Sequence, residues 1–123
     1  MKTKKLLLID DNEDNRILVK FALEINADWE VLTASDGIEG ISKAELTQPD
    51  VILLDLILPD LDGLSVCEVL KSNLFTRSIP IIFVTALTNT MVLSKLKTTF
   101  AEGVIIKPLD VLNLDLLIAE ICN

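Results

Sequence analysis

The sequence predicts an α/β fold: an open, doubly wound sheet of five parallel strands. Short apolar runs alternate regularly with longer amphipathic segments along the chain, which is the pattern of repeated β-α units. The predicted strands are continuously apolar, as is typical of parallel strands that are buried on both faces. With 123 residues, the chain is too short for an eight-fold barrel of such units. An open sheet is therefore expected.

Strands and helices are expected in strict alternation. The predicted strands are Lys5–Asp10, Glu30–Ala34, Val51–Asp55, Pro80–Thr85 and Val104–Lys107. The predicted helices are Asp14–Asn26, Asp36–Thr47, Leu64–Asn73, Thr88–Thr99 and Val111–Ile121. The second strand is the most polar, so we expect it at an edge of the sheet. The fourth begins with its proline, where no hydrogen bond of the sheet is lost.

Three of the helices carry further signals. The first has four apolar side chains on one helical stripe, which we expect to face the core: Ile17, Leu18, Phe21 and Ile25. Asp36 and Glu39 have the spacing of a capping box at the start of the second helix. Asp62 and Gly63 are interpreted as a turn and the cap of the third helix.

The charge balance limits the classes of partner. The chain has 11 basic and 19 acidic residues, a net charge of −8 at pH 7. This excess of acid argues against a broad nucleic-acid interface and against binding to an anionic membrane. It is compatible with a divalent cation, whose hard oxygen ligands come from clustered carboxylates.

Histidine and cysteine usage excludes several chemistries. The chain has no histidine and two cysteines, neither of which belongs to a C-x-x-C pair, so a structural zinc site has almost no ligands. Without histidine, Ser-His and Cys-His nucleophilic mechanisms are also excluded. Any phosphohistidine chemistry would need a histidine on another molecule.

Length and hydropathy predict one domain, residues 1–123, in the cytoplasm. Half of the residues are hydrophobic, which is enough for a single well-filled core. The basic N-terminus precedes only four apolar residues before Asp10, fewer than a secretory signal needs. No apolar run approaches the length of a membrane span.

Polar side chains stand at the C-terminal ends of four of the five predicted strands. Asp55 follows four consecutive apolar residues, where an ionised carboxylate is costly unless something compensates for it. Ligands of open α/β sheets bind in the crevice beyond these strand ends. We therefore expect the polar side chains at these ends to be neighbours in space: Asp10, Asp11, Asp55, Thr85 and Lys107.

This constellation predicts phosphoryl transfer to a carboxylate. Three carboxylates repel one another, and a Mg²⁺ ion would offset that repulsion. Lys107 supplies a positive charge and Thr85 a hydroxyl donor for phosphate oxygens, and a carboxylate is a nucleophile toward phosphorus. We interpret Asp55 as the phosphoacceptor and Asp10 with Asp11 as the metal pocket.

Local alternatives exist for some of the acidic residues. Taken alone, Asp11 and Asp14 are as readily N-terminal caps of the first helix as ligands. The segment from Asp10 begins like an EF-hand loop. Its sixth position is Asn15 and its twelfth is Phe21, where the loop requires glycine and glutamate, so calcium binding of that type is excluded.

Five short motifs follow the predicted strands in a fixed order. They are Asp10-Asp11, Asp55, Pro59 with Asp62-Gly63, Thr85-Ala86 and Lys107-Pro108. With this set, the whole chain closely resembles the receiver domain of two-component response regulators. The resemblance implies a flavodoxin-like fold with strand order 2-1-3-4-5, dependence on Mg²⁺, and phosphotransfer to Asp55 from a histidine kinase or a histidine phosphotransfer protein.

The resemblance also implies finer roles. The backbone carbonyl of Ile57 would complete the metal site, and the Lys107–Pro108 bond would be cis. Ala86 would share with Thr85 the role of phosphate binding and switching. Ile57 and Leu87 occupy the two positions that tune dephosphorylation in this family, and both are aliphatic here.

Val104 departs from the family, because receivers usually carry tyrosine or phenylalanine three residues before the lysine. That ring turns inward as the threonine moves, and valine has one stiff torsion and less surface. Two functions remain open: a phosphorylatable switch that signals by altered protein docking, and a receiver-like interaction module that takes no phosphate. A small phosphatase is disfavoured, since no second acid-base group or lid is evident, and we expect no enzyme.

The expected partners are a sensor histidine kinase or a histidine phosphotransfer protein, and a downstream protein target. Neither nucleic acid nor a membrane is expected to bind this domain. The sequence leaves open whether the domain forms a homodimer, and whether it acts alone or as part of a longer regulator or hybrid kinase.

Overall fold

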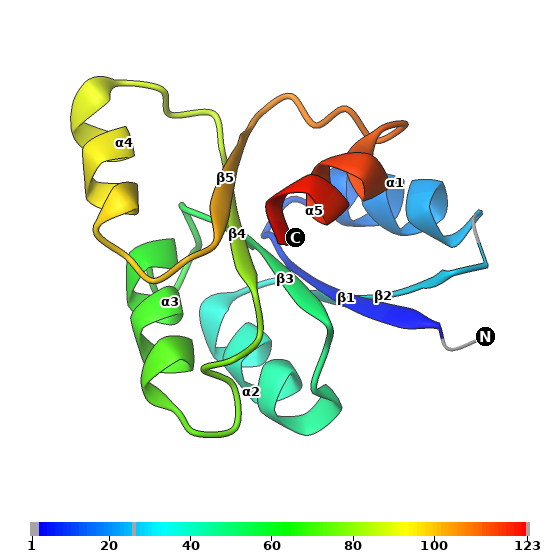
Figure 1. The fold of residues 1–123 in the computed structure, drawn as a ribbon, viewed down its shortest axis with the longest axis horizontal. Coiled ribbons are helices and arrows are strands. Elements are labelled where there is room, and N and C mark those ends of the chain that lie inside the picture. The colour runs from blue at the N-terminus through cyan, green and yellow to red at the C-terminus, as the bar shows by residue number, and fades with distance from the viewer. Residues whose placement is uncertain (1–2, 26, 123) are drawn as a thin grey trace.

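The computed structural model describes residues 3–25 and 27–122, and five strands of these ranges form one parallel sheet (Figure 1). The strands are β1 (Lys4–Ile9), β2 (Trp29–Ala34), β3 (Val51–Asp55), β4 (Ile81–Thr85) and β5 (Gly103–Ile106). Their order across the sheet is β2-β1-β3-β4-β5, and every neighbouring pair is parallel. The predicted fold class and strand order are confirmed, and the polar strand β2 lies at an edge as predicted.

Five helices of the described ranges cover the two faces of the sheet. They are α1 (Glu13–Glu24), α2 (Gly37–Thr47), α3 (Gly63–Ser72), α4 (Thr90–Lys97) and α5 (Leu114–Cys122). Helices α1 and α5 pack on one face, and α2, α3 and α4 pack on the other (Figure 1). None of the helices in the described ranges is both long and apolar enough to cross a lipid bilayer. Asn26, the last residue of the first predicted helix, lies outside the described residues.

Alternate side chains of β1 enter two separate hydrophobic cores. Leu7 and Ile9 pack with side chains of α2 and α3, whereas Leu6 and Leu8 pack with side chains of α1 and α5. All four are at most 1% exposed. Because successive side chains of a strand point to opposite faces, a strand between two helical layers must be apolar at every position. This explains the continuous apolar runs of the sequence.

Side-chain caps set the starts of α2 and α3. The Asp36 carboxylate accepts the backbone N–H of Glu39 at 2.7 Å, and the Glu39 carboxylate accepts the backbone N–H of Ser35 at 2.6 Å. This reciprocal pair confirms the predicted cap, although Glu39 reaches one residue further back than in the ideal box. Asp62 accepts the backbone N–H of Ser65 at 2.7 Å, so the predicted cap of the third helix is also confirmed.

The cap of α1 corrects one interpretation. Asn12 has an extended backbone, and its side chain accepts the backbone N–H of Asn15 at 2.9 Å. Asp14 already lies inside the helix, and Asp11 precedes the cap. Reading Asp11 or Asp14 as the cap is therefore wrong, because Asn12 between them has the backbone geometry that capping requires.

The buried face of α1 also differs from the prediction. Val19 and Leu23 are buried, whereas the four side chains of the predicted stripe are half or more exposed: Ile17 58%, Leu18 50%, Phe21 69% and Ile25 73%. At about 100° per residue, the two sets lie on opposite sides of the helix. Apolar residues occur on both sides of α1, and only tertiary packing selects the side that faces the sheet.

Candidate functional site

The carboxyl ends of four strands bring the predicted polar residues to one edge of the sheet. Asp55 and Thr85 are the last residues of β3 and β4, and Asp10 and Lys107 directly follow β1 and β5. Because the strands are parallel and paired in register, these ends lie side by side. The sequence positions that ended apolar runs are therefore neighbours in space.

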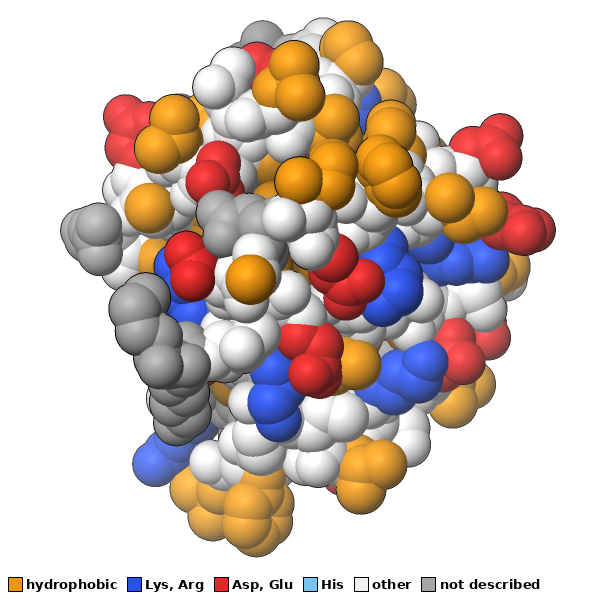
Figure 2. Space-filling view, turned by 90° about the vertical axis from the view of Figure 1, so that its right-hand side faces the viewer, with side chains coloured by type: hydrophobic (Ala, Val, Ile, Leu, Met, Phe, Trp, Pro, Cys, Tyr) orange, Lys and Arg blue, Asp and Glu red, His pale blue; other side chains and the backbone are white. Residues whose placement is uncertain are grey.

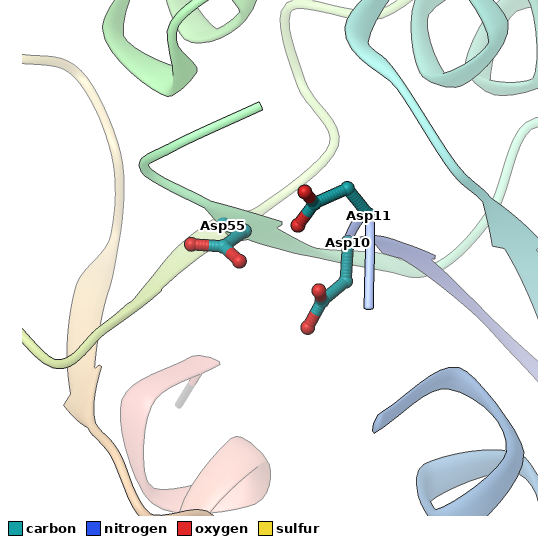
Figure 3. A group of neighbouring side chains, drawn as sticks. All are labelled: Asp10, Asp11 and Asp55. Carbon is teal, nitrogen blue, oxygen red and sulfur yellow. The ribbon is translucent and has the colours of Figure 1, made fainter. Parts of the chain in front are cut away.

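Three carboxylates form a cluster at this edge (Figure 3). One oxygen each of Asp10, Asp11 and Asp55 lies within 4.8 Å of the other two. Asp10 and Asp55 are 1% and 7% exposed, whereas Asp11 is exposed. Carboxylate oxygens together with water are the ligands that Mg²⁺ takes. The residues present therefore fit a hard divalent cation that is approached from the solvent side of Asp11.

Both carboxylate oxygens of Asp55 are held in place. Oδ2 accepts a hydrogen bond from Lys107 Nζ at 3.1 Å, and Oδ1 accepts the backbone N–H of Ile57 at 3.3 Å. Lys107 Nζ also lies 3.9 Å from Asp10 Oδ2. One lysine thus faces two buried carboxylates, and with Asp11 the cluster keeps a surplus of negative charge.

Burial raises the pKa of Asp55 above its ordinary value of 3.8. The hydrogen bond and the charge of Lys107 lower this pKa, while the charge of Asp10 raises it further, but loss of solvation is the largest effect. Further positive charge at the cluster would favour the ionised carboxylate, which is the nucleophilic form.

The loops after β4 and β5 flank the cluster. Thr85 is 2% exposed, and its hydroxyl oxygen accepts the backbone N–H of Leu87 at 3.0 Å. Ala86, between them, is exposed. The backbone N–H of Lys107 donates to the carbonyl of Thr85 at 2.8 Å, which joins the two loops. The Lys107–Pro108 peptide bond is cis, the conformation that the resemblance implied.

Gly63 lets α3 begin close behind the end of β3. Its backbone N–H donates to the carbonyl of Leu56 at 2.7 Å. A Cβ atom on Gly63 would lie 2.5 Å from the carbonyl oxygen of Asp55 and 2.8 Å from the Cα of Leu56. Both are backbone atoms with no room to move aside. The glycine therefore serves close packing of the loop in addition to the predicted turn.

Two polar residues that the sequence pattern did not single out support the site. The Asp60 carboxylate accepts the backbone N–H groups of Gly37 at 2.8 Å and Ile38 at 2.9 Å, which fastens the loop after β3 to the start of α2. Asn15 Nδ2 donates to Asp10 Oδ2 at 3.2 Å. Both are residue types common on surfaces. A contact between distant segments reveals the role of Asp60, and the folded turn into α1 reveals that of Asn15.

Comparison with known proteins identifies the family. The family model described as the response regulator receiver domain matches residues 6–119, and the chain belongs to this family. Receiver domains of response regulators accept phosphoryl groups from histidine kinases. The polar-differentiation response regulator DivK of Brucella ovis is 33% identical over 109 residues, which cover 89% of this chain and 88% of DivK.

Two further similar proteins differ in how much of their own length this chain covers. The alkaline phosphatase synthesis transcriptional regulatory protein PhoP of Bacillus subtilis (strain 168) is 43% identical over 83 residues, which cover 68% of this chain and 33% of PhoP. The chain thus spans about a third of that relative. The receiver domain of the sensor histidine kinase PA1611 from Pseudomonas aeruginosa PAO1 has a TM-score of 0.87 and 26% identity, covering 98% of this chain and 99% of that one. Its solved structure contains a magnesium ion coordinated in the active site cleft.

Proposed function

We propose that the protein is a phosphorylatable signalling switch of a two-component system or phosphorelay. A sensor histidine kinase or a histidine phosphotransfer protein donates a phosphoryl group to Asp55, and phosphorylation alters how the domain docks on a downstream protein. The chain is an acceptor that assists its own phosphorylation and dephosphorylation, and it is not an enzyme with separate substrates. The predicted cytoplasmic location stays a prediction.

The observation that carries the proposal is the surplus of carboxylates around one lysine. Lys107 alone would be enough to balance Asp55 if the pair were only structural. Asp10 is also buried, and Asp11 adds a third carboxylate within the same 4.8 Å. Such a cluster is unfavourable unless a cation joins it, so its presence favours a site that binds a metal and a phosphoryl group.

The reaction needs only positioned groups. A carboxylate oxygen of Asp55 attacks phosphorus and forms an O–P bond while the donor's P–N bond breaks. The electron pair of the broken bond remains on the donor imidazole. Lys107 Nζ donates to the phosphoryl oxygens. Thr85 also has a proton to donate, because its hydroxyl accepts from Leu87 but keeps its own hydrogen.

The carboxylates of Asp10, Asp11 and Asp55 would hold Mg²⁺ together with the backbone carbonyl of Ile57. Bound Mg²⁺ would offset the repulsion among the carboxylates and the charge of the phosphoryl oxygens. The magnesium ion in the cleft of the PA1611 receiver supports this assignment.

An exposed apolar surface on α1, α5 and the residues next to these helices supports docking of the phosphodonor. We call it the α1/α5 surface, and it consists of Ile17, Leu18, Phe21, Ile25, Leu112 and Leu116, each at least 50% exposed. In Figure 2, which views this side of the molecule, hydrophobic side chains gather over the upper half. A cavity of about 400 Å³ lined by Leu18, Lys107 and Pro108 connects this surface to the phosphoacceptor site. A helical donor seated here would bring its phosphohistidine to Asp55.

Val104 favours a second candidate, an interaction module that takes no phosphate. It is half-buried and packs against the core on the α2, α3 and α4 side, where it lacks the ring that reports phosphorylation in most receivers. Treatment with a small phosphodonor distinguishes the two functions.

The test is incubation of the purified protein with Mg²⁺ and acetyl phosphate, followed by intact-mass measurement. We expect a mass increase of one phosphoryl group that disappears in excess chelator. An unchanged mass would support the interaction module instead.

A further inference from the structure

We infer that Asn15 is a positioning residue of the metal site, whose amide orients the Asp10 carboxylate and leaves Lys107 to pair with Asp55. This role rests on the proposed function, because Asp10 matters here as a ligand for Mg²⁺. It starts from one contact, the hydrogen bond from Asn15 Nδ2 to Asp10 Oδ2 at 3.2 Å.

Asp10 is enclosed by residues of the turn into α1. Its side chain is 1% exposed. Oδ1 accepts the backbone N–H of Asn12 at 2.9 Å, and the backbone carbonyl accepts from Arg16 Nη1 at 2.8 Å. The amide of Asn15 supplies the donor for the remaining oxygen, Oδ2. A buried carboxylate needs such donors to stay charged.

The helix start fixes the position of Asn15. It is the third residue of α1, and its backbone N–H is bound to the capping side chain of Asn12 at 2.9 Å. Asparagine is a poor helix former, so helix stability does not explain its presence here. Only its NH₂ group is able to face a carboxylate oxygen, because the amide oxygen would be repelled.

The same oxygen of Asp10 is within reach of Lys107. Lys107 Nζ lies 3.9 Å from Asp10 Oδ2 but 3.1 Å from Asp55 Oδ2. Because the Asn15 amide is neutral, it satisfies Asp10 without cancelling its charge. If this donor were removed, Lys107 would be the nearest replacement, and its move toward Asp10 would weaken a metal ligand and leave Asp55 without its partner.

The experiment compares Asn15→Leu with Asn15→Gln. Leucine and glutamine have nearly equal helix propensities, so both variants change α1 in the same way, and only glutamine keeps the amide donor. The cavity of about 400 Å³ that Asn15 lines leaves room for the longer side chain. The dissociation constant for Mg²⁺ is measured by isothermal titration calorimetry without a phosphodonor, and melting temperatures in chelator are recorded alongside.

We expect Asn15→Leu to raise the dissociation constant for Mg²⁺ about tenfold, as is typical when a partner that orients a metal ligand is lost. Asn15→Gln should bind Mg²⁺ nearly as the wild type does, while the two variants melt at similar temperatures. Asn15→Ala removes the amide without adding bulk, and it should show the same weakening of Mg²⁺ binding. It therefore tests the role of the amide even if the leucine variant misfolds.

Two results would overturn the role of Asn15 alone: wild-type affinity in both the leucine and the alanine variants, or equal weakening in the glutamine and leucine variants, which would indicate a steric effect. Failure of the wild-type protein to bind Mg²⁺ at all would overturn the proposed function and this role with it.

Discussion

Two lysines pair with carboxylates at opposite ends of the sheet, and their surroundings differ in charge. Lys71 of α3 donates to the carbonyls of Arg77 and Ile79 and to the Glu102 carboxylate at 3.1 Å. Glu102 in turn accepts the backbone N–H of Ile81 at 2.8 Å, at the start of β4. One positive charge meets one negative charge, and the three donors of Lys71 are all used.

Lys107, at the carboxyl end, faces two carboxylates instead of one, and a third lies in the same cluster. It lies 3.1 Å from Asp55 and 3.9 Å from Asp10, and Asp11 belongs to the same cluster. The charges do not balance, and the pKa of Asp55 is raised mainly by its burial. A lysine with all donors used and its charge balanced, such as Lys71, fits a structural role, whereas surplus carboxylates around a lysine indicate a site for a cation or a phosphoryl group.

The largest expected effect is complete loss of phosphorylation in Asp55→Asn. An amide is not a nucleophile toward phosphorus, and the other two carboxylates are expected to serve as metal ligands. Intact-mass measurement after acetyl phosphate treatment should give no phosphorylated species, whereas Asp115→Asn, which removes an equal charge from α5, should label as the wild type does. Undiminished labelling of Asp55→Asn would show that another residue is the acceptor.

Lys71→Ala should destabilise the fold without affecting phosphorylation. Lys71 is 8% exposed and Glu102 37% exposed at their side chains, so loss of the lysine leaves the carboxylate without its charge partner and removes a donor from two carbonyls. Glu102 keeps the hydrogen bond from Ile81 N–H but loses its charge partner, so we expect the free energy of unfolding to fall by about 2–3 kcal/mol, somewhat less than for a fully buried pair. Urea denaturation followed by the fluorescence of Trp29, the single tryptophan, measures this. A variant of unchanged stability that no longer takes phosphate would reverse the assignment of the two lysines.

The lifetime of the phosphorylated state should depend on Ile57 and Leu87, which are 63% and 37% exposed. Neither side chain offers a hydrogen bond to orient an attacking water, so we expect slow loss of phosphate. An Ile57→Asn, Leu87→Glu double mutant should lose phosphate about tenfold faster, which corresponds to about 1.4 kcal/mol of barrier. The decay is followed by intact mass after removal of acetyl phosphate. Equal decay rates would exclude this role for the two positions.

Lys107→Ala should change stability little, in contrast to Lys71→Ala. Its side chain is 23% exposed, and Asp55, whose pKa is already raised by burial, takes up a proton more readily once the lysine is gone, so we expect a decrease of about 1 kcal/mol or less in the free energy of unfolding without Mg²⁺. Phosphorylated Lys107→Ala should fail to show the conformational change of the phosphorylated wild type, as compared by NMR spectra. If Lys107→Ala costs as much stability as Lys71→Ala, the distinction between a structural and a functional lysine does not hold.

The pH dependence of stability should reflect the raised pKa of Asp55. Native protein holds the Asp55 proton at pH values where the unfolded chain, with a pKa near 3.8, has lost it. The contribution of this group to stability is thus present below about pH 3.8 and is lost as the pH rises through the folded pKa. Asp55→Asn does not titrate at this position. In chelator, its free energy of unfolding should therefore exceed that of the wild type by an amount that grows as the pH rises from about 3.8 toward neutrality. A difference in free energy of unfolding that grows toward acid pH would contradict this.

The site was more predictable than the helix faces around it. Asp10, Asp55 and Thr85 could be placed together because each ends an apolar run, and the ends of parallel strands meet at one edge. The packing of α1 could not, since Ile17 and Val19 are equally apolar and lie on opposite sides of the helix. The roles of Asn15 and Asp60 also escaped prediction, because neither belongs to a periodic pattern and their partners are contributed by the turn after β1 and by α2.

The layered α/β fold and the polar residues at the strand ends could be read from the sequence, because periodicity and short motifs are local properties of the chain. The strand order followed from the family resemblance. Three features became visible only in the folded protein: which side of α1 is buried, that Lys107 lies nearer Asp55 than Asp10, and that Asn15 donates to Asp10. The first two depend on contacts between segments that are remote along the chain, and the third depends on how the turn into α1 places Asn15 against Asp10. The distances from Lys107 Nζ to Asp55 and to Asp10 differ by less than an ångström, and such a difference is set only when the helices are packed on the sheet.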